Sequence, residues 1–318
     1  MQKLLNVLRV IRAFYYLRSF HLAVKIGRYE VNPRIFHPDK KSGKISVTGF
    51  GIKLSREKHL FFLEGYRYAK SLKELVNAQF YVNEDENIII ELNGVRAIVQ
   101  TAEDLYILNE IFVDEAYCFI SDSPVVVWDI GMNIGLASLY FVSRKNAMVV
   151  GYEPFKETYE QALRNFDLNP EISKGIRTFN YGVGNQYRKV TLDYCYEYKG
   201  DLGIWGIPER LRDRVQNVRQ REITIKNAPE IIDSIVSDYP RRDIIAKIDC
   251  EGSEYEIIAA LSSAGKLNLI KVIMMEWHRD NHAKGPTELT ETLLKAGFVV
   301  SSLSPNSQFT GMIYAVRV

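Results

Sequence analysis

The stretch VVVWDIGMNIG at residues 125–135 decides the fold. Its first part, VVVWDI, is apolar almost to its end without alternating, which is typical of a strand buried on both faces. Gly131 then allows the chain to turn without a Cβ clash, and Gly135 allows the following helix to pack close to the strand. A buried strand that turns directly into a helix predicts an α/β unit whose backbone approaches a ligand at the turn.

Four further apolar runs have the same character, and helical segments alternate with them. The runs are MVVGYE at 148–153, IRTFNY at 176–181, IIAKID at 244–249 and IKVIMME at 270–276, and helices are expected at 134–145, 155–168, 229–237, 253–264 and 286–296. This alternation predicts an α/β fold with a doubly wound, Rossmann-like parallel sheet. FVVSSL at 298–303 and GMIYAVRV at 311–318 are joined by a loop too short for a parallel crossover, so we expect a C-terminal antiparallel hairpin.

The chain before this sheet has a different pattern. Residues 30–60 predict loops and short strands, 62–76 a helix, and 78–100 two strands, at 81–92 and 95–101, joined through Asn93-Gly94. A helix at 102–112 leads into the main domain. We therefore expect a small α+β accessory region over residues 1–100 and a ligand-binding domain over 101–318.

Residues 1–28 form a basic, amphipathic segment. It contains no acidic residue, and its basic residues are Lys3, Arg9, Arg12, Arg18, Lys25 and Arg28. The arginines interrupt the apolar residues, so the segment fits neither a secretion signal nor a bilayer-spanning helix, and we expect a cytoplasmic protein. The helical spacing of its apolar residues favours packing on its own domain or on a second subunit, as in a homodimer; peripheral membrane contact is the alternative.

Composition excludes several classes of protein. The 318 residues are 47% hydrophobic and 25% charged, which is ordinary globular usage and excludes a mostly disordered chain. The net charge of +2 gives no whole-molecule attraction for nucleic acid or an anionic membrane. Cys118, Cys195 and Cys250 lie too far apart for a zinc or redox motif, which fits a reducing compartment.

The turn after the first strand carries an acid where a dinucleotide loop would not. The pattern is D-x-G-x-N-x-G, with Asp129 before the first glycine and Asn133 where G-x-G-x-x-G would place a glycine. Asp129 would repel an anion, whereas the N–H groups at the helix start attract one. A ligand with both an ammonium group and a carboxylate satisfies both, and S-adenosylmethionine has such a methionine end.

The second strand ends in Glu153, where an acid accepts hydrogen bonds from both hydroxyls of an unphosphorylated ribose. A carboxylate at this position rejects a 2′-phosphate. Residues just after the third strand, Asn180, Tyr181 and Gly182, are the expected neighbours of the adenine.

Acidic residues follow the fourth strand in KIDCEGSE, residues 247–254. Asp249 ends the strand at the edge where α/β sheets bind ligands, so we assign it to a substrate or cofactor contact, with Glu251 beside it. Glu254 is interpreted as the acid that opens the next helix, with Ser253 as its cap.

The fifth strand ends in MMEWHRDNH, residues 274–282, beside the same edge. Glu276 or His278 could remove a proton from an acceptor hydroxyl, and we expect a neutral imidazole acting as general base. A polar loop that only holds neighbouring backbone is the alternative. Glu276, His278 and His282 could also hold a metal, but no matching ligand pattern recurs, so we predict no metal.

A long segment, 183–228, separates the third and fourth strands. RKVTLDYCYEY at 188–198 alternates like an exposed strand, and five arginines follow: Arg210, Arg212, Arg214, Arg219 and Arg221. Clustered arginines suit an anionic acceptor, although a solvated face is the alternative. Tyr198 and Trp205 could stack on a sugar or a base.

Four segments together resemble the FkbM-type S-adenosylmethionine-dependent methyltransferases. They are VVWDIGMNIG, YEPF, KIDCEGSEYEII and VIMMEWH, and the resemblance covers about residues 105–318. Met132 and Cys250 depart from the residues that this family often has, Ala and Val, without removing a polar group. The resemblance implies a seven-stranded methyltransferase sheet and O-methylation, often of a sugar or natural-product hydroxyl. It also implies that the cofactor is held by Asp129, Gly131, Asn133, Gly135 and Glu153, and that Asp249 and Glu251 border the reaction site.

We therefore expect an O-methyltransferase that uses S-adenosyl-L-methionine for direct methyl transfer to a small-molecule or glycan acceptor. The catalytic candidates are Asp249, Glu251, Glu276 and His278. Nucleic acid is an unlikely partner, although methylation of RNA is one alternative, and a non-catalytic scaffold that retains the cofactor pocket is another.

Overall fold

The computed structural model describes residues 10–11, 23–24, 31–39, 41–55, 58–144, 147–208, 211, 213, 215, 217–279, 285–303 and 309–317. The chain forms two compact units, Met1–Ala116 and Tyr117–Val318. The boundary therefore follows residue 116, whereas the sequence suggested residue 100. The reason is helix α5 (Ala102–Phe112), which contacts α4 (Tyr66–Leu75) and β6 (Val95–Val99) of the first unit.

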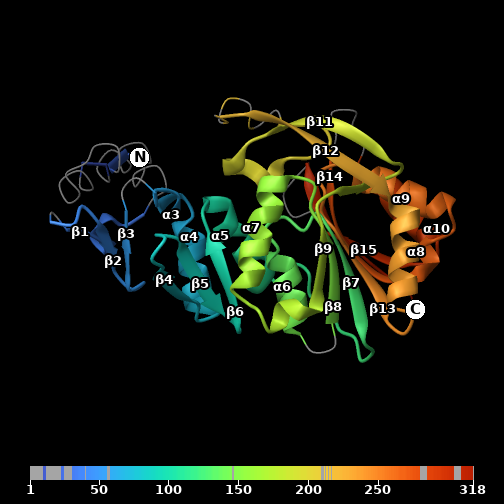
Figure 1. Cartoon of the computed structure of the whole chain (residues 1–318), viewed down its shortest axis with the longest axis horizontal. Helices are drawn as coiled ribbons and strands as arrows, with labels where there is room; N and C mark the ends of the chain where they lie inside the picture. Colours follow the sequence, from blue (N-terminus) through green and yellow to red (C-terminus); the bar gives the residue numbers. More distant parts are fainter. Residues whose placement is uncertain are drawn as a thin grey trace. The chain divides into compact units, whose positions relative to one another are not determined.

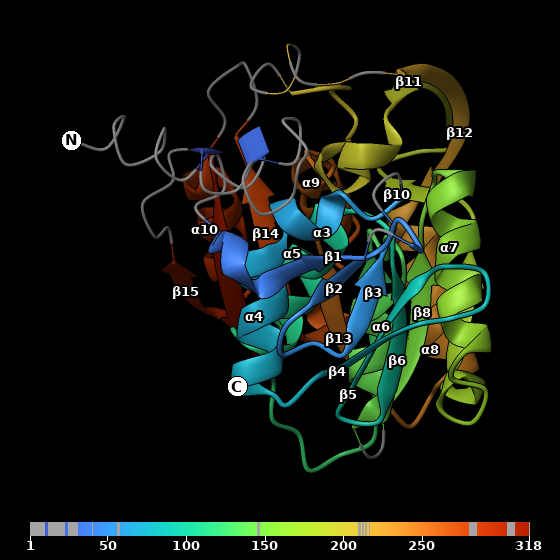
Figure 2. The ribbon, with the colours of Figure 1, turned by 90° about the vertical axis from the view of Figure 1, so that its left-hand side faces the viewer.

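The N-terminal unit contains two small antiparallel sheets. One has the order β1 (Phe36–Pro38), β2 (Ile45–Val47), β3 (Ile52–Leu54), and the other β4 (Gln79–Val82), β5 (Ile88–Leu92), β6. Strand β3 contacts β4, and the short helix α3 (Phe61–Glu64) precedes α4 (Figure 2). The rings of Phe62 and Phe80 meet the ring of Phe50 edge-on, at centroid distances of 5.3 and 4.9 Å, inside this unit.

One sequence expectation for this unit is wrong. Residues 81–92 do not form a single strand, because the polar run after Val82 makes a turn between β4 and β5. Asn87 N–H donates to Asn83 Oδ1 at 2.8 Å, and Asn83 N–H donates to Asn87 O at 3.0 Å. The hairpin turn at Asn93-Gly94 is confirmed between β5 and β6.

The C-terminal unit is built on the expected seven-stranded sheet (Figure 1). Its order is β15 (Val299–Leu303), β16 (Thr310–Val316), β14 (Ile270–His278), β13 (Asp243–Ile248), β7 (Val125–Ile130), β8 (Ala147–Tyr152), β9 (Ile176–Phe179). Strands β14, β13, β7, β8 and β9 are parallel to one another, whereas β16 is antiparallel to both β14 and β15. This confirms the doubly wound sheet and its C-terminal hairpin.

Helices cover both faces of this sheet (Figure 1). Helices α6 (Leu136–Ser143) and α7 (Lys156–Asp167) lie on one face, and α8 (Ala228–Asp238), α9 (Glu254–Ser263) and α10 (Pro286–Lys295) lie on the other. One hydrophobic core packs against the second group of helices and includes the fully buried Trp128 and Trp277. Burial on both faces explains why the strands read as unbroken apolar runs.

The long segment after β9 folds as a second, smaller sheet. Its order is β10 (Gly182–Gly184), β12 (Arg219–Asn227), β11 (Arg188–Tyr194), and it encloses its own apolar cluster, which includes Phe155, Cys195 and Ile223. Strand β11 was expected, and β12 was not. Arg219 and Arg221 lie in β12, whereas Arg210, Arg212 and Arg214 lie outside the described residues.

The basic N-terminal segment is almost entirely outside the described residues. Only 10–11 and 23–24 within residues 1–28 are described, so its expected roles in packing, dimerisation or membrane contact stay predictions. Within the described part of the chain, no helix has the length and apolar character needed to cross a membrane.

Candidate active site

The turn after β7 brings two strand ends together. Gly131 has φ +77°, and a Cβ at this residue would lie 1.7 Å from the carbonyl oxygen of Asp249, so only glycine fits. Gly135 has φ +81°, and a Cβ there would lie 2.6 Å from the ring of Phe166 on α7. The turn is therefore pressed between the end of β13 and helix α7, as the glycine pattern predicted.

The N–H groups of this turn are used differently from the sequence interpretation. Gly131 and Met132 N–H both donate to the carbonyl oxygen of Tyr152, at 3.1 and 2.9 Å, and Asn133 N–H donates to Glu153 Oε2 at 3.1 Å. These donors hold the turn onto the end of β8. They are therefore occupied by the protein and do not face a ligand carboxylate.

Glu153 lies at the end of β8 and is 5% exposed. Besides the bond from Asn133, its Oε1 accepts Phe155 N–H at 2.9 Å. Burial raises the pKa of Glu153 to about 7, against the opposing effect of these two backbone hydrogen bonds. Each carboxylate oxygen accepts more than one hydrogen bond, so Glu153 can still accept two hydroxyl groups.

Asp129 pairs with the protein's own cation. Its carboxylate is fully buried, accepts the hydroxyl of Ser138 at 2.6 Å, and lies 3.4 Å from the ammonium group of Lys247, its partner across β7 and β13. The sequence led us to expect a ligand ammonium group at Asp129. The structure instead places Lys247 there, because the register of the two strands sets these side chains opposite each other.

Lys247 connects both carboxylates to the glycine turn. Its Nζ donates to Gly131 O at 2.6 Å and lies 3.4 Å from Asp249 Oδ2. Burial lowers the pKa of Lys247, but Asp249 and Asp129 outweigh burial and hold it above its usual value, so the side chain is charged. The hydroxyl of Tyr117 also donates to Asp249 Oδ2, at 3.2 Å.

A cavity lies between the strand ends and the smaller sheet. The central sheet contributes Ile130, Gly131, Glu153 and Asp249 to its lining, and the segment around the smaller sheet contributes Lys199, Leu202, Ile223 and Ile225. Its open volume is about 690 Å³, counting the mouth to solvent. Asn133, Gly182 and Glu251 also line it, whereas Asp129, Gly135 and Tyr181 do not.

Tyr181 belongs to an aromatic cluster beside this cavity. Its ring lies 5.3 Å from Tyr152 and 5.4 Å from Phe179, and Lys226 Nζ lies 4.0 Å above it. Asn180 donates its side-chain amide to the carbonyl oxygen of Glu153 at 2.9 Å. Of the three expected adenine neighbours, Gly182 thus lines the cavity, Tyr181 packs next to it and Asn180 holds the backbone.

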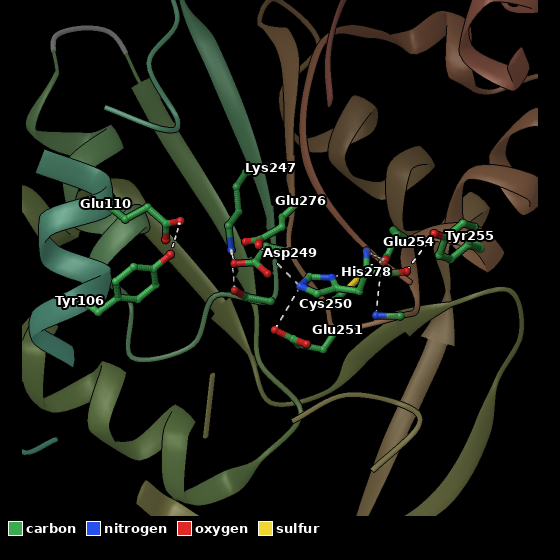
Figure 3. A network of polar contacts seen from close by, with 12 residues as sticks. Tyr106, Glu110, Lys247, Asp249, Cys250, Glu251, Glu254, Tyr255, Glu276 and His278 are labelled. Carbon is green, nitrogen blue, oxygen red and sulfur yellow. Dashed lines mark hydrogen bonds and ion pairs between the residues drawn. The ribbon is translucent and has the colours of Figure 1, made fainter. Parts of the chain in front are cut away.

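The acids after β13 surround one histidine (Figure 3). His278, at the end of β14, is 6% exposed; its Nε2 lies 3.2 Å from Glu251 and 3.8 Å from Glu276, and its Nδ1 lies 3.4 Å from Glu254. Glu254 is fully buried and accepts Gly252 N–H at 2.8 Å and His278 N–H at 2.6 Å. Glu254 therefore holds the turn and the strand together, and Ser253 makes no capping hydrogen bond.

These acids change the expected state of His278. Burial disfavours the charged ring, but Glu251 and Glu254 outweigh burial and hold the pKa of His278 well above its usual value. These contacts therefore favour the imidazolium form of His278 over the neutral imidazole that the sequence suggested. Burial raises the pKa of Glu251, and His278 opposes that rise.

Sequence reasoning missed Lys247, Lys199 and Tyr117. Lys247 had a signal, because a charged residue between Ala246 and Ile248 in an apolar strand needs a partner. Lys199 and Tyr117 had none. Trp205, the expected stacking residue, packs its ring against Gly252 and is 45% exposed, and His282 lies outside the described residues.

Known proteins resemble this chain over the region that carries the site. Residues 129–300 match the model of the methyltransferase FkbM domain, which is more than half of the chain. The AMB antimetabolite synthetase AmbE of Pseudomonas aeruginosa is 27% identical over 232 residues, 63% of this chain and 11% of that protein. The chain thus spans about a tenth of the length of that curated relative.

Two solved structures are similar to parts of the chain at low identity. Methyltransferase FkbM from Methylobacillus flagellatus KT has a TM-score of 0.41 and 15% identity, over 80% of this chain and 59% of that chain. A putative tRNA (m1A22) methyltransferase of Streptococcus pneumoniae, in complex with S-adenosyl-L-methionine, has a TM-score of 0.35 and 14% identity, over 64% of this chain and 71% of that chain.

Proposed function

Because the chain belongs to the FkbM methyltransferase family, we propose that it transfers a methyl group from S-adenosyl-L-methionine to a hydroxyl of a sugar or another small natural product. The observation that carries the proposal is Glu153, a buried carboxylate whose two oxygens are fixed by backbone donors at the edge of an open cavity. A carboxylate in that position accepts two neighbouring hydroxyl groups, which is what a ribose presents.

The remaining lining of the cavity also fits this cofactor. Asp249 and Glu251 line it together with Glu153, and these carboxyl groups provide the negative surroundings that a sulfonium and an ammonium group favour. Ile130, Val183 and Ile225 supply apolar contact for a purine ring. When bound, the cofactor supplies an activated methyl group on its sulfonium, so the protein mainly has to orient the acceptor and take up its proton.

We assign the proton to Glu251 and not to His278. The raised pKa of His278 favours its imidazolium form, which has no proton-accepting nitrogen. Burial raises the pKa of Glu251, which increases its tendency to take a proton from an acceptor hydroxyl. His278 then acts as a positioning residue that fixes the carboxylate through the 3.2 Å contact.

We propose a neutral acceptor. Three carboxylates, Asp249, Glu251 and Glu276, lie near the ends of β13 and β14 and are partly exposed, so an anionic group would be repelled. Of the five arginines that favoured an anionic acceptor or RNA, Arg210, Arg212 and Arg214 lie outside the described residues, and Arg219 and Arg221 lie in β12. Hydroxyl-rich molecules, in contrast, donate hydrogen bonds to carboxylates.

Calorimetry with S-adenosylmethionine tests the cofactor site. We expect one site per chain and a loss of affinity of about 10- to 100-fold in Glu153→Ala, because two hydrogen bonds to a charged group are removed. Glu160→Gln is the matched control, since Glu160 is an exposed acid on α7 that pairs with Lys156 at the surface. Unchanged affinity in Glu153→Ala, or binding of a nicotinamide cofactor instead, would overturn the assignment.

Product analysis tests the reaction. Incubating the protein with S-adenosylmethionine and a panel of hydroxylated small molecules, with and without sugars, should yield S-adenosylhomocysteine and a methylated acceptor by mass spectrometry. Glu251→Gln should lose most of the turnover, while its cofactor affinity should fall far less than that of Glu153→Ala. Equal turnover in Glu251→Gln would refute its role as base, and cofactor binding with no product from any hydroxylated acceptor would favour the scaffold alternative.

A further inference from the structure

Three potential metal ligands meet at the ends of β13 and β14. One ligand atom each of Asp249, Glu276 and His278 lies within 4.8 Å of the others. We propose that these residues bind one divalent metal cation beside the cofactor cavity. The inference rests on the proposed methyltransferase function, because it gives the cation a role in holding the acceptor.

The strand register creates this arrangement. Ile248 pairs with Met275 in the parallel β13–β14 ladder, so the next residues, Asp249 and Glu276, lie side by side where β13 ends. Glu276 and His278 are two residues apart on β14, and their side chains therefore point to the same side of the sheet. Figure 3 shows the three side chains grouped at this edge.

His278 provides an observation independent of the acids. It is a polar side chain more than nine-tenths buried, directed into the cluster, with Nε2 only 3.8 Å from Glu276. Its Nδ1 faces Glu254 at 3.4 Å, so Nε2 is the nitrogen that faces Glu276 and the cation position. Histidine is among the commonest metal ligands and can bind through either ring nitrogen.

Asp249 has an oxygen available for the same cation. The bonds from Tyr117 and Lys247 both reach Oδ2, and in the described part of the chain no contact reaches Oδ1. Asp249 also lines the cavity, whereas Glu276 and His278 do not. A cation bound by the three would therefore lie at the border of the cofactor cavity, where an acceptor must approach.

The local charge favours a cationic ligand. Five carboxyl groups surround this edge, and two cationic side chains accompany them: Asp129, Asp249, Glu251, Glu254 and Glu276, with Lys247 and His278. An excess of carboxylates in a largely buried region is costly unless a cation joins them. Coordination through His278 would replace its ring proton by the metal.

The mixed donor set indicates the kind of metal. Two carboxylates and one imidazole suit a cation that accepts both oxygen and nitrogen, such as Mn²⁺, and three protein ligands leave positions open for an acceptor. An acceptor hydroxyl bound there loses its proton more readily, and Glu251 takes that proton. The oxygen then forms a bond to the methyl carbon as the carbon–sulfur bond breaks, and its electron pair stays on the sulfur of the neutral thioether.

Mn²⁺ titration followed by electron paramagnetic resonance tests binding without any acceptor, because bound Mn²⁺ loses the signal of the free ion. We expect one Mn²⁺ per chain, with affinity at least about tenfold weaker in Glu276→Gln and in His278→Gln. His37→Gln is the matched control, since His37 is an exposed histidine of the N-terminal unit, bonded to Thr48. Equal Mn²⁺ affinity in wild type, Glu276→Gln and His278→Gln overturns the site.

Activity separates this proposal from the previous one. Treatment with a chelator should suppress formation of S-adenosylhomocysteine, and added Mn²⁺ should restore it. If the protein binds S-adenosylmethionine and no chelator affects its turnover, the metal site is overturned and the methyltransferase function is not. Failure to bind S-adenosylmethionine, with Mn²⁺ still bound, would overturn the proposed function instead. If one variant does not fold, the number of Mn²⁺ ions bound by the wild type and the Mn²⁺ affinity of the second variant still test the metal site.

Discussion

Replacing Lys247 by methionine tests the electrostatic centre of the site. Methionine retains much of the apolar stem but leaves Asp129 without its cation in a position with no access to water. At an effective dielectric constant of about 20, a pair 3.4 Å apart interacts by roughly 5 kcal/mol, and removing one partner of a buried pair typically costs about 3–5 kcal/mol. We therefore expect Lys247→Met to lower the free energy of unfolding of the C-terminal unit by about 3–5 kcal/mol.

The double variant Lys247→Met/Asp129→Asn provides the control. It removes the cation and the buried charge together, so mainly the hydrogen bond to Gly131 O is lost, and the cost should fall to about 1–2 kcal/mol. A double variant as unstable as the single one would show that the charge of Asp129 is not what Lys247 compensates.

Tryptophan fluorescence in urea is the appropriate assay. The three tryptophans of the chain, Trp128, Trp205 and Trp277, all belong to the C-terminal unit, so their signal reports the unfolding of that unit alone. Circular dichroism would combine both units. A loss below about 1 kcal/mol in Lys247→Met, with an unchanged denaturant slope, would refute the reasoning.

Three further outcomes follow from particular residues. Burial raises the pKa of Glu153 to about 7, so its carboxylate form, which accepts hydrogen bonds, becomes rare as the pH falls. Below that pH, the S-adenosylmethionine affinity measured by calorimetry should fall by up to about tenfold per pH unit. Constant affinity from pH 8 to 6 would contradict this. Gly131→Ala should lower the free energy of unfolding by more than about 2 kcal/mol, because the new Cβ would clash with backbone atoms. Gly43→Ala, at φ +69° with no atom near the new Cβ, should cost only about 1 kcal/mol. Similar losses in the two variants would be inconsistent with the clash. Arg188→Gln breaks a half-buried ion pair and should cost about 1 kcal/mol in urea unfolding, while the exposed neighbouring change Lys189→Gln should have no measurable effect.

The sequence predicted the layers of the fold because buried elements have recognisable patterns of apolar residues. Strands such as β7 and β13 are covered on both faces, and their unbroken apolar runs follow directly from that. The same reasoning failed for residues 81–92, because the apolar residues at both ends of this segment suggested one strand, whereas the polar residues from Asn83 onward form a turn. It also missed β12, whose mixed residues pair with β11 across a long connection.

The site was only partly predictable, for a geometric reason. Glycine and acid positions are visible in a sequence, which is why Gly131, Glu153 and Asp249 were identified and do meet at one edge. Which donor reaches which acceptor depends on register and on approach between distant segments. Asp129 was therefore matched to a ligand when Lys247 was its partner, and His278 was expected to be neutral because the three carboxylates around it come from two separate segments.

The two walls of the cavity belong to two different hydrophobic clusters. One wall lies on the central sheet, and the other comes from residues 199–204 and from Ile223 and Ile225, which pack into the smaller sheet. Substitutions in the second wall therefore repack a small cluster and leave the glycine turn and Glu153 in place. The segment that forms the second wall can therefore be varied, in nature or by protein engineering, without changing the residues of the central sheet that line the cavity.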